Sequence, residues 1–285
     1  METNSNFVLS LCPTGIVPTR SMSPHVPLTP EEVARDVAEC LPLGVNTVHL
    51  HARNERGENC NRPETYARFI AAVRAVSEEV VICASCSGRI DPSLEARSAV
   101  LDLEGELRPD MASLTLGSMN FTRSASVNSP DVIIGLAEKM QANGIKPELE
   151  VFDVGMMNFA HYMIAKGYLQ PPYLFNIILG NPCTSQSDPL HLGTILREMP
   201  EQSLWAVGGI GRHQSSAVTL GLASQGGVRI GLEDNLWLDR DRTALATNTQ
   251  LVQRCTQVAA ALERVPYTPA QLRQRLLPGC GTVQR

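Results

Sequence analysis

Short apolar runs alternate with helical patterns eight times along this chain of 285 residues. The apolar runs, which we predict to be strands, are residues 7–12, 47–51, 80–85, 111–116, 148–153, 173–179, 204–207 and 228–232. The predicted helices are residues 29–40, 63–77, 92–103, 130–143, 158–166, 190–199, 215–225 and 248–264. Eight such units predict an α/β fold of the (β/α)8 TIM-barrel type. A doubly wound sheet is the alternative, and it is disfavoured because no Gly-x-Gly-x-x-Gly turn follows the first strand.

We expect a single catalytic domain over residues 1–285, with a helical tail after the eighth helix, because no linker or repeat interrupts the pattern. The hydrophobic fraction of 43% supports one large core. A net charge of −5 disfavours nucleic acid and membrane surfaces as partners, and no apolar run is long enough to span a membrane. The eight scattered cysteines are typical of reduced thiols, and residues 1–6 lack the basic start of a signal peptide. These features predict a cytoplasmic protein.

The second predicted strand ends in two histidines, His49 and His51, that are two residues apart. Alternate side chains share a face of a strand, so both imidazoles point the same way. Such a pair can bind a divalent metal, zinc most readily, although polar positions at a sheet end produce the same spacing. Active sites of (β/α)8 barrels lie at the C-terminal ends of the strands, which is where the pair falls.

The eighth predicted strand contains Arg229, and Glu233 and Asp234 follow directly after it. By strand alternation Arg229 and Glu233 share a face, and closure of the barrel leaves one strand between them and the histidines. Glu233 then becomes a third ligand beside His49 and His51, which leaves an open coordination position as in catalytic zinc sites. Asp234 is the candidate general base, and Arg229 is placed to tune its pKa or to bind a substrate carboxylate. A structural salt bridge between Arg229 and Glu233 is the alternative.

An ordered set of motifs covers nearly the whole chain and resembles one enzyme family. The motifs are Pro13-Thr14-Gly15, Pro27-Leu28-Thr29-Pro30-Glu31-Glu32, His49-Leu50-His51-Ala52-Arg53, Arg108-Pro109-Asp110-Met111-Ala112-Ser113-Leu114, Lys146-Pro147-Glu148-Leu149-Glu150-Val151-Phe152, Trp205-Ala206-Val207-Gly208-Gly209-Ile210-Gly211-Arg212 and Arg229-Ile230-Gly231-Leu232-Glu233-Asp234-Asn235. They resemble the β-keto acid cleavage enzyme family, whose members are zinc-dependent (β/α)8 proteins.

The resemblance implies condensation of a 3-keto acid with acetyl-CoA to give acetoacetate and a new acyl-CoA. It implies that His49, His51 and Glu233 hold Zn²⁺, and that Asp234, assisted by Arg229, removes a proton between the carbonyl and the carboxylate. The enolate then attacks the thioester, and a retro-Claisen step releases the products. The resemblance further implies that Ser85 and Ser113 bind the acetoacetate-like end of the substrate and that the protein is a homotetramer.

This chain departs from the family pattern at the position where some members carry a glutamate for a cationic substrate. Val17 stands there, which argues against an amine-bearing keto acid. The family's Ser-Thr-Gly-Gly reads Ser85-Cys86-Ser87-Gly88, and Ser113 replaces a frequent threonine while keeping the hydroxyl.

Two other functions compete with 3-keto acid cleavage. The first is a zinc-dependent hydrolase on a TIM barrel, in which the metal binds hydroxide. It is less favoured because amidohydrolase-like barrels carry their histidine pair on the first strand and further histidines on strands five and six, whereas here those two predicted strands have none. The second is a non-enzymatic binding protein, which would not need Arg229, Glu233 and Asp234 beside the histidines.

Overall fold

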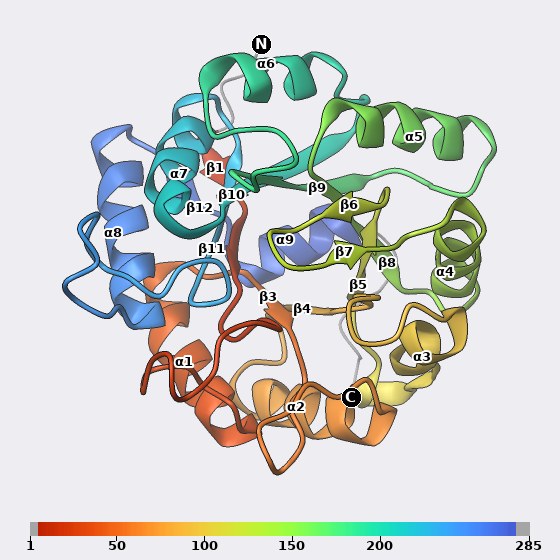
Figure 1. Ribbon diagram of the computed structural model, residues 1–285, viewed down its shortest axis with the longest axis horizontal. Helices are drawn as coiled ribbons and strands as arrows, with labels where there is room; N and C mark the ends of the chain where they lie inside the picture. Colours follow the sequence, from red (N-terminus) through yellow and green to blue (C-terminus); the bar gives the residue numbers. More distant parts are fainter. Residues whose placement is uncertain (1–4, 278–285) are drawn as a thin grey trace.

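A computed structural model describes residues 5–277 and shows a closed barrel of parallel strands surrounded by helices (Figure 1). Around the barrel the strand order is β10-β11-β2-β3-β4-β5-β8-β9, and every neighbouring pair is parallel. The bounds are β2 Leu9–Leu11, β3 Thr47–Leu50, β4 Val81–Ala84, β5 Met111–Thr115, β8 Lys146–Val151, β9 Tyr173–Leu179, β10 Ser203–Gly209 and β11 Gly227–Ile230. The (β/α)8 prediction is therefore confirmed.

The helices form the outer layer, and their apolar faces pack on the strands. Their bounds are α1 Pro30–Cys40, α2 Pro63–Val76, α3 Leu94–Ser98, α4 Pro130–Ala142, α5 Val154–Ala165, α6 Pro189–Arg197, α7 Gln214–Ala223, α8 Asn248–Ala261 and α9 Pro269–Leu276. Helix α1 begins as its sequence predicts: Thr29 caps it, Pro30 occupies the first turn, and Glu32 closes a capping box. The main hydrophobic core lies between this layer and the barrel.

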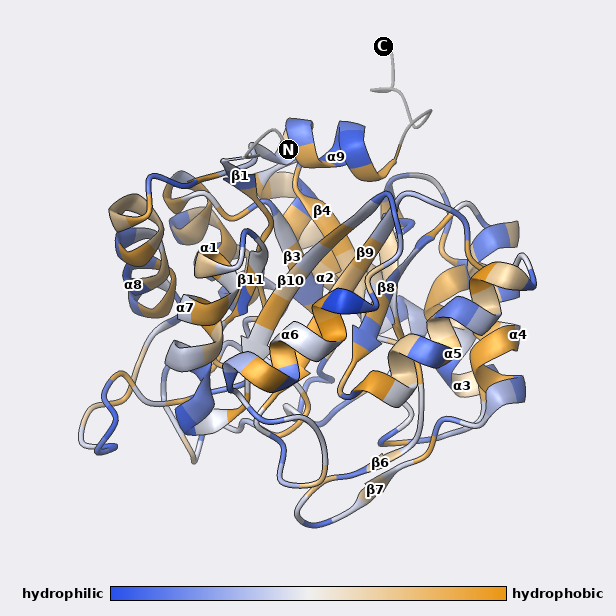
Figure 2. Ribbon diagram, turned by 90° about the horizontal axis from the view of Figure 1, so that it is seen from above, coloured by the Kyte–Doolittle hydropathy of each residue, from blue (hydrophilic) through white to orange (hydrophobic). Residues whose placement is uncertain are grey.

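The two ends of the barrel are closed differently (Figure 2). Helix α9 covers the N-terminal ends of the strands, where its Leu272 and Leu276 belong to a second apolar cluster with Val81 and Met111. At the opposite end lies a small hairpin of β6 (Met119–Asn120) and β7 (Ala125–Ser126). One end of the barrel is thus sealed by apolar side chains, and the other carries the loops that follow the strands.

Several element boundaries differ from the prediction, and two of the differences have a clear physical cause. Strand β11 ends at Ile230 instead of residue 232, because Gly231 adopts a φ of +152° and a Cβ there would lie 2.1 Å from the carbonyl oxygen of Cys12. Helix α5 begins at Val154 instead of residue 158, because the side chain of Asp153 accepts a hydrogen bond from the amide of Met156 and caps it.

The predicted single domain covers residues 1–285, of which residues 1–4 and 278–285 lie outside the described residues. Helix α9 supplies a helical segment after α8. Within residues 5–277, every helix is too short or too polar to cross a bilayer.

Candidate active site

The histidine pair and Glu233 come together at the C-terminal end of the barrel. His49 lies at the end of β3, His51 follows it, and Glu233 lies in the turn after β11. The imidazole centroids of His49 and His51 are 5.2 Å apart, and Nε2 of His51 lies 3.3 Å from Oε1 of Glu233. One nitrogen of each imidazole and one carboxylate oxygen all lie within 4.8 Å of one another. The three residues can therefore share one metal ion.

The electrostatics of Glu233 and His51 fit a divalent metal. Burial opposes ionisation of Glu233, but Arg229 and the two histidines outweigh it and hold its pKa well below the usual range. Burial lowers the pKa of His51, which keeps its imidazole neutral. The second carboxylate oxygen, Oε2 of Glu233, is buried and has no hydrogen-bond partner among the described residues. Two imidazoles and an ionised carboxylate form the donor set of a catalytic zinc site.

Arg229 holds two carboxylates at once. Its Nη2 lies 2.7 Å from Oε1 of Glu233, and its Nε lies 2.9 Å from Oδ2 of Asp234. The turn at Gly231 folds both acidic residues back onto Arg229, so Glu233 reaches the site from a turn and not from an extended strand. Burial raises the pKa of Asp234, although Arg229 opposes this, so Asp234 is a stronger base than an exposed aspartate.

Glu148, on β8, is a candidate site residue that the sequence analysis did not single out. Its Oε2 lies 2.7 Å from Nδ1 of His49. Burial lowers the pKa of His49, but the carboxylate outweighs this and raises it to about 9. A carboxylate on Nδ1 leaves Nε2 as the ligand atom, the usual arrangement behind a metal-binding histidine. The sequence did contain a signal for it. Glu148 and Glu150 are two residues apart in a predicted barrel strand, so their charged side chains point to the same face.

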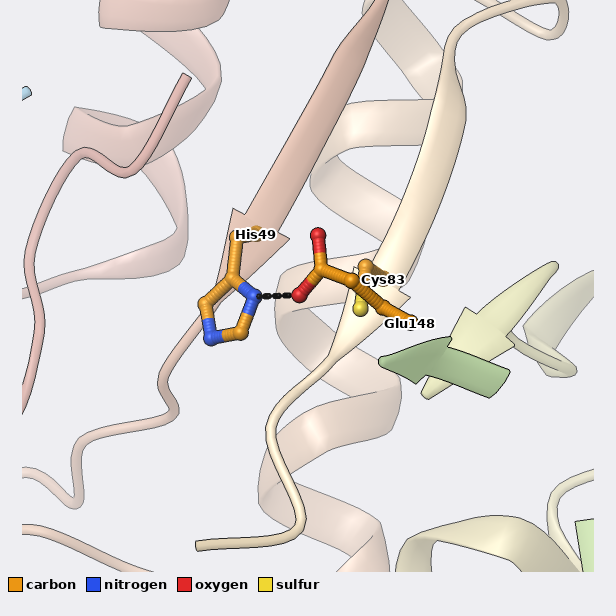
Figure 3. A group of neighbouring side chains, drawn as sticks. All are labelled: His49, Cys83 and Glu148. Carbon is orange, nitrogen blue, oxygen red and sulfur yellow. Dashed lines mark hydrogen bonds and ion pairs between the residues drawn. The ribbon is translucent and has the colours of Figure 1, made fainter. Parts of the chain in front are cut away.

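A second group that could hold a metal shares His49 with the first. It consists of His49, Cys83 and Glu148, and Figure 3 shows the sulfur of Cys83 beside the pair of His49 and Glu148. All three side chains are buried. Burial raises the pKa of the Cys83 thiol well above its usual range, which keeps it protonated and a poor ligand. We therefore favour the group with His51 and Glu233.

The site opens into a cavity of about 340 Å³. Ser85 and Val17 line it, together with His51, Glu233, Asp234 and Arg229. Ser113 is buried, and its Oγ accepts a hydrogen bond from the amide of Cys86, behind the loop that carries Ser85. Ser113 is absent from the described lining of the cavity, so its direct contact with substrate stays a prediction. The remaining described lining is Ile16, Pro18, Met22, Ser87, Arg89, Thr115, Met119, Phe121, Thr122, Ser126, Glu150, Phe152, Ile178, Ile210, Gly211, Leu232, Asn235, Leu236, Trp237 and Arg242.

Fold and site together define a (β/α)8-barrel enzyme with a candidate metal centre beside a buried aspartate–arginine pair. Residues 6–277 match the beta-keto acid cleavage enzyme family, and the chain belongs to that family. The resemblance inferred from the motifs is confirmed.

Two relatives cover nearly the whole chain. A 3-keto-5-aminohexanoate cleavage enzyme from Fusobacterium nucleatum is 32% identical over 275 residues, which is 95% of this chain and 97% of that protein. A 3-oxoadipate:acetyl-CoA acetyltransferase from Cupriavidus necator is 32% identical and covers 94% of each chain. The two relatives share an equal level of identity with this chain and differ in the named keto acid.

Among solved structures, the apo structure of ObcA superposes with a TM-score of 0.76 at 20% identity. The match covers 89% of this chain and 66% of ObcA. At this identity the similarity supports the barrel fold alone.

Proposed function

We propose that this enzyme condenses a 3-keto acid with acetyl-CoA and releases acetoacetate and a new acyl-CoA. In this exchange the acyl group of the keto acid passes to CoA, and the acetyl group takes its place. The observation that carries the proposal is the placement of a metal-capable group directly beside Arg229 and Asp234 in one cavity. The names of the two relatives, each of which acts on a 3-keto acid, support it.

We propose that His49, His51 and Glu233 hold Zn²⁺. When bound, zinc supplies a Lewis acid that stabilises negative charge on the oxygens of the keto acid. Glu148 fixes the orientation of His49 through Nδ1, and Arg229 keeps Glu233 ionised.

Asp234 is the proposed general base. Its carboxylate removes a proton from the carbon between the keto group and the carboxylate of the substrate. Arg229 orients the carboxylate of Asp234 by donating hydrogen bonds to it from Nε and Nη2. Both side chains are largely buried, which strengthens their electrostatic contacts relative to those of an exposed pair. Ser85 lies in the cavity wall and is placed to bind the substrate carboxylate.

A zinc-dependent hydrolase, the other reaction predicted from the sequence, is not favoured. Membership of the cleavage enzyme family points away from it.

Mass spectrometry tests the proposal. The zinc-loaded protein is mixed with acetyl-CoA and a panel of 3-keto acids, with acetyl-CoA omitted as control. We expect acetoacetate together with an acyl-CoA whose acyl group matches the keto acid. Unchanged substrates across the panel, with zinc shown to be bound, would contradict the proposal, and release of free acetate would point to hydrolysis.

The expected homotetramer and cytoplasmic location stay predictions. The tetramer follows from the family resemblance, and light scattering on the purified protein tests it.

A further inference from the structure

One wall of the cavity is apolar and aromatic. Phe121, which follows β6, packs edge-to-face on Phe152 with their ring centroids 6.0 Å apart, and Met119 and Ile178 line the same cavity. The polar part of the lining includes His51, Glu233 and Asp234. A keto acid held at these residues therefore extends its variable end toward other lining residues.

Arg89 and Arg242 are the two arginines in the described lining that the proposed chemistry does not use, and Arg89 is the less exposed of them. Arg89 lies in the loop between β4 and α3, and its side chain is half-buried. Its guanidinium carbon lies 4.3 Å from the centroid of the Phe121 ring, a cation–π contact that orients the planar group. Aromatic stacking leaves the edge of the guanidinium, with its N–H donors, free to bind an oxyanion.

The guanidinium of Arg89 has no carboxylate partner in the described chain. Of residues 5–277, none forms an ion pair or a side-chain hydrogen bond with it. Burial lowers its pKa, with Glu233 as the opposing charge, so the site is partly desolvated. A partly buried, unpaired arginine in a substrate cavity favours an anionic ligand.

The other charged residues in the described lining are less suited than Arg89 to bind an anionic ligand. Arg229 is already paired with Glu233 and Asp234. Glu150 accepts a hydrogen bond from Thr115 at 2.6 Å, and Val17 brings no charge to the wall. Arg242 also lines the cavity, but it is exposed.

The geometry points to a 3-keto acid with a second carboxylate at its distal end, and it assigns Arg89 as the residue that binds that carboxylate. This inference rests on the reaction proposed above and names its substrate class. Val17 agrees with it, because a carboxylate at that position would repel the distal anion.

Matched substrates test the assignment. 3-Oxoadipate and 3-oxohexanoate share their chain length and differ in a distal carboxylate against a methyl group, and 3-keto-5-aminohexanoate supplies a cationic tail. We expect kcat/KM to be highest for 3-oxoadipate. We compare kcat/KM for 3-oxoadipate with kcat/KM for 3-oxohexanoate. In Arg89→Gln we expect this ratio to fall by about tenfold to a hundredfold, because that is the usual contribution of a hydrogen bond to a charged group. Arg89→Lys restores part of the ratio, and the exposed Arg123→Gln leaves it near that of the wild type.

Calorimetric titration of each keto acid into zinc-loaded protein, without acetyl-CoA, separates this inference from the reaction. Selective loss of 3-oxoadipate affinity in Arg89→Gln supports the assignment even if no acyl-CoA forms. Turnover that prefers the neutral or cationic acid overturns the assignment and leaves the reaction standing. A raised KM for acetyl-CoA with an unchanged substrate ratio also overturns it, because Arg89 then binds the phosphates of CoA.

Discussion

Nδ1 of His49 lies 2.7 Å from Oε2 of Glu148, although β3 and β8 are separated in the barrel by β4 and β5. The contact therefore crosses the barrel interior. Figure 3 shows the other ring nitrogen of His49 directed away from Glu148. Glu148 thus sets which nitrogen of His49 is free to bind a metal.

Replacing Glu148 with glutamine removes this charge while keeping the side-chain volume. We expect Glu148→Gln to weaken zinc binding by about tenfold to a hundredfold, the usual effect of losing a carboxylate behind a metal-binding histidine. Competition with a chromophoric chelator measures the affinity. Glu64→Gln, at an exposed position in the first turn of α2, serves as the matched control. Wild-type affinity in Glu148→Gln would contradict the role.

The two overlapping groups that could hold a metal lead to opposite expectations for zinc binding by variants of Cys83 and Glu233. If zinc binds with His51 and Glu233, Glu233→Gln loses at least about tenfold in affinity, because it replaces a charged ligand, while Cys83→Ser retains zinc. Metal analysis after dialysis measures both variants. Cys86→Ser, also buried, controls for placing a hydroxyl in the interior. The reverse pattern would place the metal between Cys83 and Glu148.

Asp234→Asn separates catalysis from metal binding. The asparagine oxygen still accepts a hydrogen bond from Arg229, so we expect zinc content to be preserved. Loss of the base lowers kcat by about a hundredfold to ten-thousandfold, with a small change in KM. Steady-state acetoacetate formation measures the effect. A kcat close to that of the wild type would remove Asp234 from the mechanism.

Asp36, on α1, makes stability depend on pH. Burial raises its pKa from 3.8 to about 6, although Asn248 Nδ2 donates a hydrogen bond at 2.7 Å. The folded state therefore favours the protonated carboxyl, and its contribution to the free energy of unfolding is present below pH 3.8 and lost as pH rises through about 6. Asp36→Asn, which stays neutral, should gain about 1 to 2 kcal/mol over the wild type between pH 4 and pH 8.

Urea unfolding of both proteins at several pH values, followed by tryptophan fluorescence, measures this difference. Asp241→Asn provides the control, since Asp241 is exposed in the loop between β11 and α8. A difference between Asp36→Asn and the wild type that is independent of pH would show that Asp36 is ionised in the folded protein throughout this range.

Much of the barrel and of the metal-capable group was predictable because the signals are local. Strand and helix periods repeat along the chain, and His49 and His51 share a face through strand alternation alone. The prediction that Glu233 lies near the histidines rested on a partly wrong assumption, namely that the strand continues to residue 232. The strand ends at Ile230, and the turn at Gly231, forced by contact with Cys12, brings Glu233 and Asp234 back to Arg229.

The sequence alone determined the alternation of elements, the face of the histidine pair and the family motifs, since each depends on residues close together in the chain. Only the tertiary structure decided that Glu148 meets His49 across 99 positions, that Cys83 lies beside them, and that Arg89 rests on Phe121. Those contacts depend on the stagger of the barrel strands and on the paths of the loops. Packing of the whole chain sets both, and no local pattern encodes them.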